Sequence, residues 1–213
     1  NNNNNNRMAM SNKENDLMRV INQDARALLE NPIIEGMSKI DWGKAMARPN
    51  EIIQKNLLNN LGIKSYDPEI DIDCPKIDTT NNSPGFDMVV KNKDGKYFRI
   101  QSKLRQVNGN TEFSSQTHFE TTRRHSKKNQ GAASESGHVA YGCDEFDYVM
   151  VTLINVGKNN KKIKNRNDVN NWCFSLIPVN ELINKEKNCC ESKISAKLLE
   201  KYKFDPRTPY SFT

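Results

Sequence analysis

The sequence predicts a single α/β domain in which helices flank a mixed β-sheet. Three observations indicate this fold class: apolar residues recur at helical spacing before residue 62, alternate with polar residues beyond it, and form two nearly continuous apolar runs in the second half. The length of 213 residues suits one domain, expected to span residues 11–213. Residues 1–10 begin with a run of asparagine, which predicts a disordered tail or an expression remnant.

Two helices are expected before the sheet. Ser11–Glu14 fits a capping box, and apolar residues then repeat at helical spacing until Pro32 ends the run. A second helix is expected to begin near Pro49, because proline suits the first helical turn, and to end at Gly62, because glycine favours the position after a helix.

The strands are predicted from shorter signals. Ile70–Cys74 alternates apolar with acidic residues and predicts a half-exposed strand. Asp87–Lys91 and Lys96–Leu104 flank a turn that contains Asp-Gly, a strong hairpin signal. Phe146–Ile154 is apolar enough to be a central strand covered on both faces, and Trp172–Ile177 predicts another strand.

Further helices are expected around these strands. Gln116–Lys128 has helical potential, and helices are also expected from Asn180 onward and over Ser192–Tyr202. The segment between the two apolar strands, Val156–Asp168, is then a loop that joins neighbouring strands of the sheet.

The net charge of +6 is concentrated in two segments. Lys103–Lys128 has six basic and two acidic residues, and Val156–Asp168 has five basic and one acidic residue, so each carries +4 and the rest of the chain carries −2. Such clusters are typical of proteins that bind nucleic-acid phosphates, although a solvated lysine-rich loop gives the same pattern.

Composition excludes several classes of protein. No apolar run approaches the ~18 residues that span a membrane, and the first residues hold no apolar signal core, so we expect a cytoplasmic protein without a membrane partner. The five cysteines are an odd number without the paired spacing of a zinc site, to which His138 with Cys143 comes nearest. We therefore expect free thiols.

One group of polar residues meets in the predicted hairpin. Residues two apart on a strand share a face, so Gln101 and Lys103 point to the same side of the second strand, and antiparallel pairing brings Asp87 to the same end. A carboxylate, an amide oxygen and an ammonium group then converge. Such a group can bind a hard divalent cation through oxygen and place a lysine beside it.

Pro84, Asp87 and Gln101-Ser102-Lys103 resemble the motif of the PD-(D/E)XK nucleases, more narrowly the variant of some type II restriction endonucleases in which glutamine replaces the acidic residue. The resemblance implies a restriction-endonuclease-like fold and a Mg²⁺ cofactor held by Asp87, Gln101 and the main-chain carbonyl of Ser102. It also implies that Lys103 orients or activates the attacking water. Two departures are visible: two residues separate Pro84 from Asp87, and Gln101 supplies no charge.

A further acidic residue would complete this site. Many members of the family supply a carboxylate from a helix before the sheet, which makes Glu51 a candidate catalytic residue. A glutamate in the first turn of a helix can instead stabilise the helix dipole. The acidic residues of 67–73 form a rival metal cluster, although their alternation with isoleucine fits the exposed face of a strand better.

Side chains for DNA contact follow the motif. Arginine can read guanine and glutamine can read adenine, whereas serine, threonine and lysine suit phosphates. The two histidines could contact DNA or act as general bases, a role that a lysine-centred metal site does not require. The expected contacts are Arg105, Gln106, Gln116, Thr117, His118, Thr122, Arg123, Arg124, His125, Lys127 and Lys128, with Lys158, Lys161, Lys162 and Lys164 contacting the DNA backbone from the second basic segment.

Together these features predict a Mg²⁺-dependent, sequence-specific endonuclease that hydrolyses double-stranded DNA. The resemblance further implies a homodimer, because the two-fold symmetry of a dimer matches a palindromic site. Two alternatives stay open. One is a DNA-binding protein without catalysis on a decayed nuclease fold, and the other is a repair or junction nuclease that cuts by DNA structure.

Overall fold

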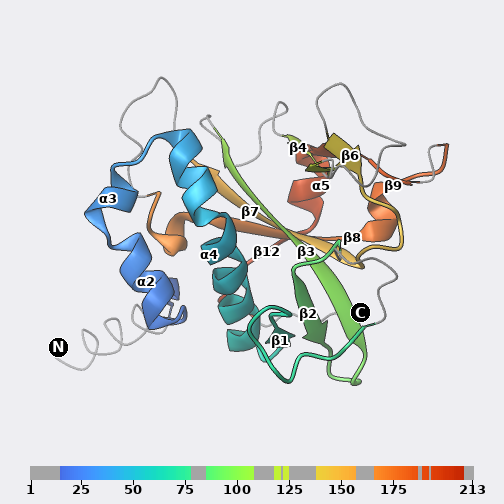
Figure 1. Cartoon of the computed structure of the whole chain (residues 1–213), viewed down its shortest axis with the longest axis horizontal. Helices are drawn as coiled ribbons and strands as arrows, with labels where there is room; N and C mark the ends of the chain where they lie inside the picture. Colours follow the sequence, from blue (N-terminus) through green and yellow to red (C-terminus); the bar gives the residue numbers. More distant parts are fainter. Residues whose placement is uncertain are drawn as a thin grey trace, which may run out of the picture.

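The protein, described here by a computed structural model, is mixed α/β and built around a six-stranded sheet (Figure 1). The structure describes residues 15–77, 85–107, 118–120, 122–124, 138–156, 166–186, 189–191 and 193–208. In the sheet, β3 and β7 are parallel and the other neighbours are antiparallel. The order is β1 (Lys64–Tyr66), β2 (Met88–Lys91), β3 (Tyr97–Val107), β7 (Tyr148–Asn155), β8 (Cys173–Pro178) and β12 (Lys203–Phe204).

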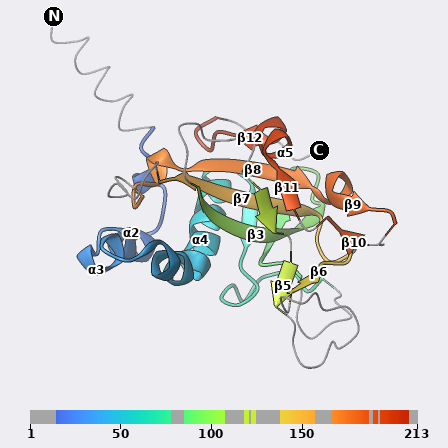
Figure 2. The same cartoon turned by 90° about the horizontal axis from the view of Figure 1, so that it is seen from above.

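Helices lie on both faces of the sheet (Figure 2). The N-terminal half supplies η1 (Leu17–Arg19), α2 (Gln23–Leu29), α3 (Pro32–Glu35) and α4 (Lys39–Asn60), and the C-terminal half supplies η2 (Val169–Asn171), η3 (Val179–Leu182) and α5 (Ala196–Lys201). Alternating residues of each strand enter different cores. Met88 and Ile100 join the core under α4, whereas Val89 and Val149 join the core that contains Leu199 of α5.

Helix α4 begins ten residues earlier than expected, so the prediction of a start near Pro49 is wrong. The Ser38 side chain caps the helix by accepting from the Asp41 N–H at 3.1 Å. Pro49 lies inside the helix, where it removes one backbone hydrogen bond. Buried residues on both sides, including Trp42 and Ile53, stabilise the helix by about 1.5–3 kcal/mol each, which offsets that loss.

The end of α4 agrees with the expectation. The last helical residue is Asn60, and Gly62 follows with a φ of 79°, a left-handed conformation that glycine adopts without strain. The chain then turns directly into β1.

The single N-terminal helix expected before Pro32 is wrong, because Asn22 divides this segment into η1 and α2; the expected end before Pro32 is confirmed, since α2 ends at Leu29 and a separate helix, α3, begins at Pro32. Asn22 accepts from the Ala25 N–H at 2.8 Å and starts α2, and Asn31 accepts from the Ile33 N–H at 2.9 Å and starts α3. Each side chain satisfies a donor that a continuous helix would have bonded through its backbone. Ser11–Glu14 lies outside the described residues.

The strand expected at Ile70–Cys74 is also wrong. Asp67 starts a turn there: its carbonyl accepts from the Asp71 N–H at 2.9 Å and its carboxylate from the Glu69 N–H at 3.0 Å. Acidic side chains that bond nearby backbone N–H groups favour turns over strands. The strand that pairs with β2 is β1, which lies earlier in the chain.

The hairpin is confirmed, with Lys91 opposite Tyr97 and Met88 opposite Ile100. The apolar run in the second half is also confirmed as β7, which lies between β3 and β8. Because β8 is the antiparallel neighbour of β7, the basic segment Val156–Asp168 does connect adjacent strands. The described helical turns near the C-terminus, η3 and α5, are shorter than expected.

The segment from β3 to β7 contains short strands instead of the expected helix over Gln116–Lys128. The described residues of this segment form β4 (His118–Glu120), β5 (Thr122–Arg124) and β6 (His138–Ala140). β4 pairs with β11 (Lys193–Ser195), β5 pairs with β6, and a further pair joins β9 (Ile183–Asn184) to β10 (Cys189–Cys190).

Two class-level expectations can be compared with the structure. No helix within the described residues is long and apolar enough to cross a membrane. Free thiols are confirmed at two of the described cysteines, Cys74 and Cys143.

Candidate active site

The site forms where β2 begins beside β3. The Asp87 N–H, one residue before β2, donates to the Ile100 carbonyl at 2.8 Å and extends the ladder by one bond. Ser102 lies two residues after Ile100 on β3, so its N–H and carbonyl point toward the β2 side of the strand, as those of Ile100 do. At this level the chain has not yet entered β2, so no strand lies opposite them. The Ser102 N–H donates instead to Asp87 Oδ2 at 2.9 Å.

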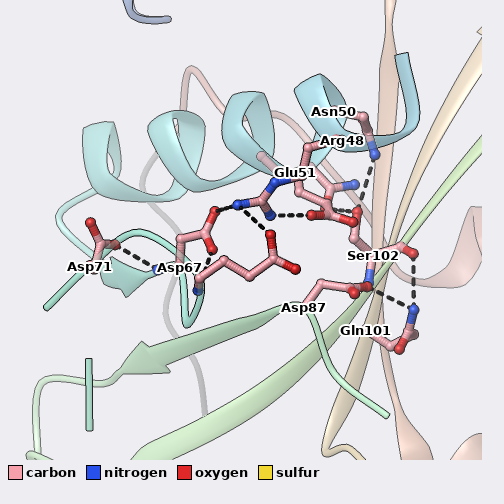
Figure 3. A network of polar contacts seen from close by, with 10 residues as sticks. Arg48, Asn50, Glu51, Asp67, Asp71, Asp87, Gln101 and Ser102 are labelled. Atoms are coloured by element: carbon pink, nitrogen blue, oxygen red, sulfur yellow. Dashed lines mark hydrogen bonds and ion pairs between the residues drawn. The ribbon is translucent and has the colours of Figure 1, made fainter. Parts of the chain in front are cut away.

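The Gln101 amide bridges two oxygens at this edge. Its Nε2 donates to Asp87 Oδ2 at 2.7 Å and to the Ser102 carbonyl at 3.3 Å (Figure 3). The carboxylate and the carbonyl therefore converge on one position, and half a turn of the Gln101 amide would exchange its nitrogen for oxygen there. The three ligand groups expected from the sequence are adjacent.

Burial shifts the pKa values of the two charged residues of the motif. It raises the pKa of the Asp87 carboxyl, which the Ser102 N–H bond and the charges of Lys103 and Arg48 oppose. Burial also lowers the pKa of the Lys103 ammonium, which the charge of Asp87 opposes. Lys103 Nζ lies 5.1 Å from the centre of the Tyr141 ring, a cation–π contact. Each charge therefore depends on a neighbour of opposite sign.

Glu51 lies in the middle of α4 and close enough to Asp87 for their charges to interact. The pKa of Glu51 is raised to about 7, chiefly because the carboxyl is buried; the bond from Arg48 opposes this shift, and the carboxylates of Asp87 and Asp67 contribute to it. Because α4 begins at Lys39, Glu51 is far from the first helical turn, and the helix dipole does not explain its position.

Arg48 binds Glu51 to the acidic turn that follows β1. Its guanidinium pairs with Glu51 Oε2, with Asp67 Oδ2 at 2.6 Å and with Glu69 Oε2 at 3.3 Å (Figure 3). Lys55 pairs in the same way with Asp71. The acidic residues of 67–73 thus attach a turn to α4. Across the part of the chain that the structure describes, no three histidine, cysteine or acidic residues form a metal-binding group.

Two basic-segment residues are buried in the protein. Gln106 is 9% exposed, and its amide donates to the Lys39 carbonyl at 2.7 Å and accepts from Arg166 at 3.3 Å. Arg166 is 4% exposed, lies 5.0 Å from the Trp42 ring and donates to two backbone carbonyls. Both side chains join β3 and the second basic segment to the start of α4, whereas Arg105 is exposed.

The remaining predicted DNA contacts are only partly described. His118 lies in β4, and Thr122, Arg123 and Arg124 form β5, but their side chains lie outside the described part of the structure. The others lie outside the described residues altogether: Gln116, Thr117, His125, Lys127, Lys128, Lys158, Lys161, Lys162 and Lys164.

Residues that sequence reasoning missed lie on α4, behind the motif. Asn50 and Gln54 are 1% and 0% exposed and contact the Ser102 side chain, and Arg48 holds Glu51. The signal in the sequence is a pair of amides four residues apart on an otherwise apolar helix face. The later expected start at Pro49 leaves Arg48 outside the helix, whereas Asn50 and Gln54 lie within the expected helix but have no role assigned from the sequence.

The pH dependence of stability is expected to show the raised pKa of Glu51. A carboxyl whose pKa is about 7 when folded and near its ordinary 4.5 when unfolded keeps its proton longer in the folded chain. Its contribution to the unfolding free energy is therefore full below about pH 4.5 and is lost as the pH rises to 7. Denaturant unfolding in metal-free buffer from pH 5 to pH 8 measures this loss. Glu51→Gln should remove this part of the decline, and an unchanged pH profile would contradict the assignment.

The chain matches no family model, and comparisons with curated proteins and with solved structures also gave no match. A functional assignment must therefore come from the geometry of the site and the chemistry of its residues.

Proposed function

We propose that this protein is a Mg²⁺-dependent endonuclease of double-stranded DNA that resembles the PD-(D/E)XK type II restriction enzymes. The observation that carries the proposal is the convergence of Asp87 Oδ2 and the Ser102 carbonyl on the Gln101 amide, beside Lys103 and Glu51. The motif expected from the sequence thus has a compatible geometry, including a carboxylate from the preceding helix.

The residues present fit a hard divalent cation. Carboxylate, amide and backbone carbonyl oxygens are the ligands that such ions prefer. When all groups are ionised, the carboxylates of Glu51, Asp67, Glu69 and Asp87 outnumber the nearby cations Arg48 and Lys103 by two negative charges. A divalent cation would offset this excess, and bound Mg²⁺ would supply Lewis-acid stabilisation of the charge that develops on the scissile phosphate.

The protein's own groups would position the reactants. Lys103 lies close enough to Asp87 for their charges to interact, so its ammonium can hold the attacking water by a hydrogen bond and add positive charge at the transition state. The Ser102 N–H keeps Asp87 in place. Arg48 keeps Glu51 from turning away from the site.

The fold is consistent with a restriction-endonuclease-like core. A long helix, α4, is followed by the antiparallel strands β1, β2 and β3, and a crossover then leads to β7, parallel to β3. The proposed metal site lies at the β2–β3 hairpin, next to the helix. This arrangement supports the nuclease assignment without depending on any single residue.

DNA would approach along the basic side of the site. β3 continues from Lys103 to the exposed Arg105, and the first basic segment extends from there through β4 and β5. The second basic segment begins directly after β7, the neighbour of β3, although its Arg166 is buried and cannot contribute. We propose that these segments hold duplex DNA across a homodimer whose two sites act on a palindrome.

Incubation of supercoiled plasmid with the protein and Mg²⁺ tests this function. We expect discrete fragments that disappear when EDTA is added, because the reaction needs the divalent ion. A smear or preferential cutting of branched DNA would favour a repair or junction nuclease. A gel shift of duplex DNA without any cleavage would instead support the non-catalytic binder in which Gln101 marks a decayed site.

A further inference from the structure

Helix α4 contacts the back of the proposed metal site through two buried amides. Gln54 Oε1 accepts from Ser102 Oγ at 2.7 Å, and Asn50 Nδ2 donates to the same hydroxyl at 3.1 Å. The Ser102 side chain is thus fixed both as donor and as acceptor (Figure 3 shows the Asn50 contact). Few orientations of a hydroxyl satisfy both bonds, so the side-chain rotation of Ser102 is restricted.

Gln54 is itself held by the neighbouring strand. Its Nε2 donates to the Met150 carbonyl at 3.2 Å and to Thr152 Oγ1 at 2.9 Å, both on β7. Met150 is the partner of Ser102 in the parallel pairing of β3 with β7. The amide therefore joins α4 to both strands at the level of the motif.

The surroundings of these amides are apolar, so their polarity needs an explanation. On the same face of α4, Met46, Ile53 and Leu57 are fully buried. Asn50 Oδ1 is buried without a hydrogen-bond partner among the described residues, a loss that typically costs about 1–3 kcal/mol. Apolar side chains of similar volume would fill this space at no such cost. Stability alone does not account for the pair.

Ser102 connects this network to the site. Its side chain points to α4 because strand residues alternate between faces, while its N–H and carbonyl lie in the plane of the sheet and face Asp87 and Gln101. Fixing Oγ therefore fixes the two peptide groups next to it. Groups that hold metal ligands in this way commonly change metal affinity by about 10–100-fold when they are removed.

We propose that Asn50 and Gln54 are positioning residues of the metal site, which hold the Ser102 carbonyl in place through the Ser102 hydroxyl. This inference rests on the proposed function, because it requires the Ser102 carbonyl to be a metal ligand. It adds that the core-facing side of α4 sets metal affinity without touching the metal.

Calcium binding, measured by calorimetry on the full chain, tests the inference with a metal that binds oxygen ligands. Ser102→Ala removes the hydroxyl but keeps the carbonyl, and Gln54→Met keeps the volume but removes the acceptor. Each should raise the Kd for Ca²⁺ about tenfold. The double variant should resemble the single variants, because both changes remove the same contact.

Ser175→Ala is the matched control. Ser175 is also a buried serine of the sheet, but it lies on β8, away from the site. Its hydroxyl donates to the Leu199 carbonyl of α5 at 2.6 Å. Ser175→Ala should lower the unfolding free energy by about 1 kcal/mol, similar to Ser102→Ala, and leave the Kd for Ca²⁺ unchanged. Equal Ca²⁺ affinity in the wild type, Ser102→Ala and Gln54→Met would overturn the inference while leaving the proposed function intact. A wild-type chain that binds no divalent ion would instead remove the proposed function.

Discussion

Lys103→Met is expected to lower the rate of DNA cleavage at least about a hundredfold and to leave specific DNA binding measurable. The substitution keeps an unbranched, flexible side chain of similar size, but removes the ammonium, and with it the charge that interacts with Asp87 and the cation–π contact with Tyr141. That ammonium is the group we expect to hold the attacking water. Single-turnover cleavage and a gel shift of the same duplex, performed with Ca²⁺ in place of Mg²⁺ for binding, separate the two effects.

Lys91→Met provides the control for this experiment. Lys91 is also a lysine of the hairpin with its ammonium near an aromatic ring, at 5.5 Å from Tyr97, but it lies at the turn end, away from Asp87. Its variant should cleave at the wild-type rate. Full cleavage by Lys103→Met would refute the catalytic role of Lys103, and equal losses in both variants would indicate a general effect of hairpin charge.

The hairpin and its site could be predicted from sequence because short-range rules determine them. The Asp-Gly turn sets the register of β2 and β3, and the register alone places Asp87 opposite the Gln101–Lys103 end of the partner strand. Because neighbouring strand residues point to opposite faces of the sheet, the side chain of Ser102 lies on the other face from that of Gln101. No information from distant parts of the chain is needed for these steps.

The contribution of α4 could not be predicted in the same way, because it depends on tertiary packing. Pro49 was expected to start a helix, yet burial on both sides of it sustains a helix of 22 residues. Only this longer helix includes Arg48, which pairs with Glu51. Gln106 shows a similar limit: its hydrogen-bonding capacity predicted a DNA contact, but its amide donates to the Lys39 carbonyl at the start of α4 and accepts from the buried Arg166.

The acidic turn shows how local bonds can override a strand pattern. Alternation of isoleucine with aspartate predicted a strand over Ile70–Cys74, but Asp67 bonds the N–H groups of the following residues. Ile70 and Ile72 are consequently exposed, at 60% and 105%. The same turn supplies Asp67 and Glu69 to Arg48.

Asp87→Asn is expected to abolish metal binding and cleavage and, in metal-free buffer, to raise the melting temperature. Burial raises the pKa of Asp87, so its ionised form lowers the unfolding free energy at neutral pH. Asparagine removes that charge, and its carbonyl oxygen can still accept from Gln101 and Ser102. A gain of ~1 kcal/mol corresponds to roughly 2–4 °C in a chain of this size.

Thermal unfolding with EDTA or with excess Ca²⁺ separates the two parts of this prediction. The wild type should gain stability from Ca²⁺ by mass action, whereas Asp87→Asn should not respond. Asp147→Asn is the contrast, because Asp147 pairs with Arg99 at 3.2 Å on the same sheet and its loss should lower the melting temperature. A lower melting temperature for Asp87→Asn in EDTA would show that Asp87 supports the fold rather than a cation. Opposite signs for these two aspartates would mean that Asp87 remains in the chain at a cost to stability, as expected of a residue kept for metal binding.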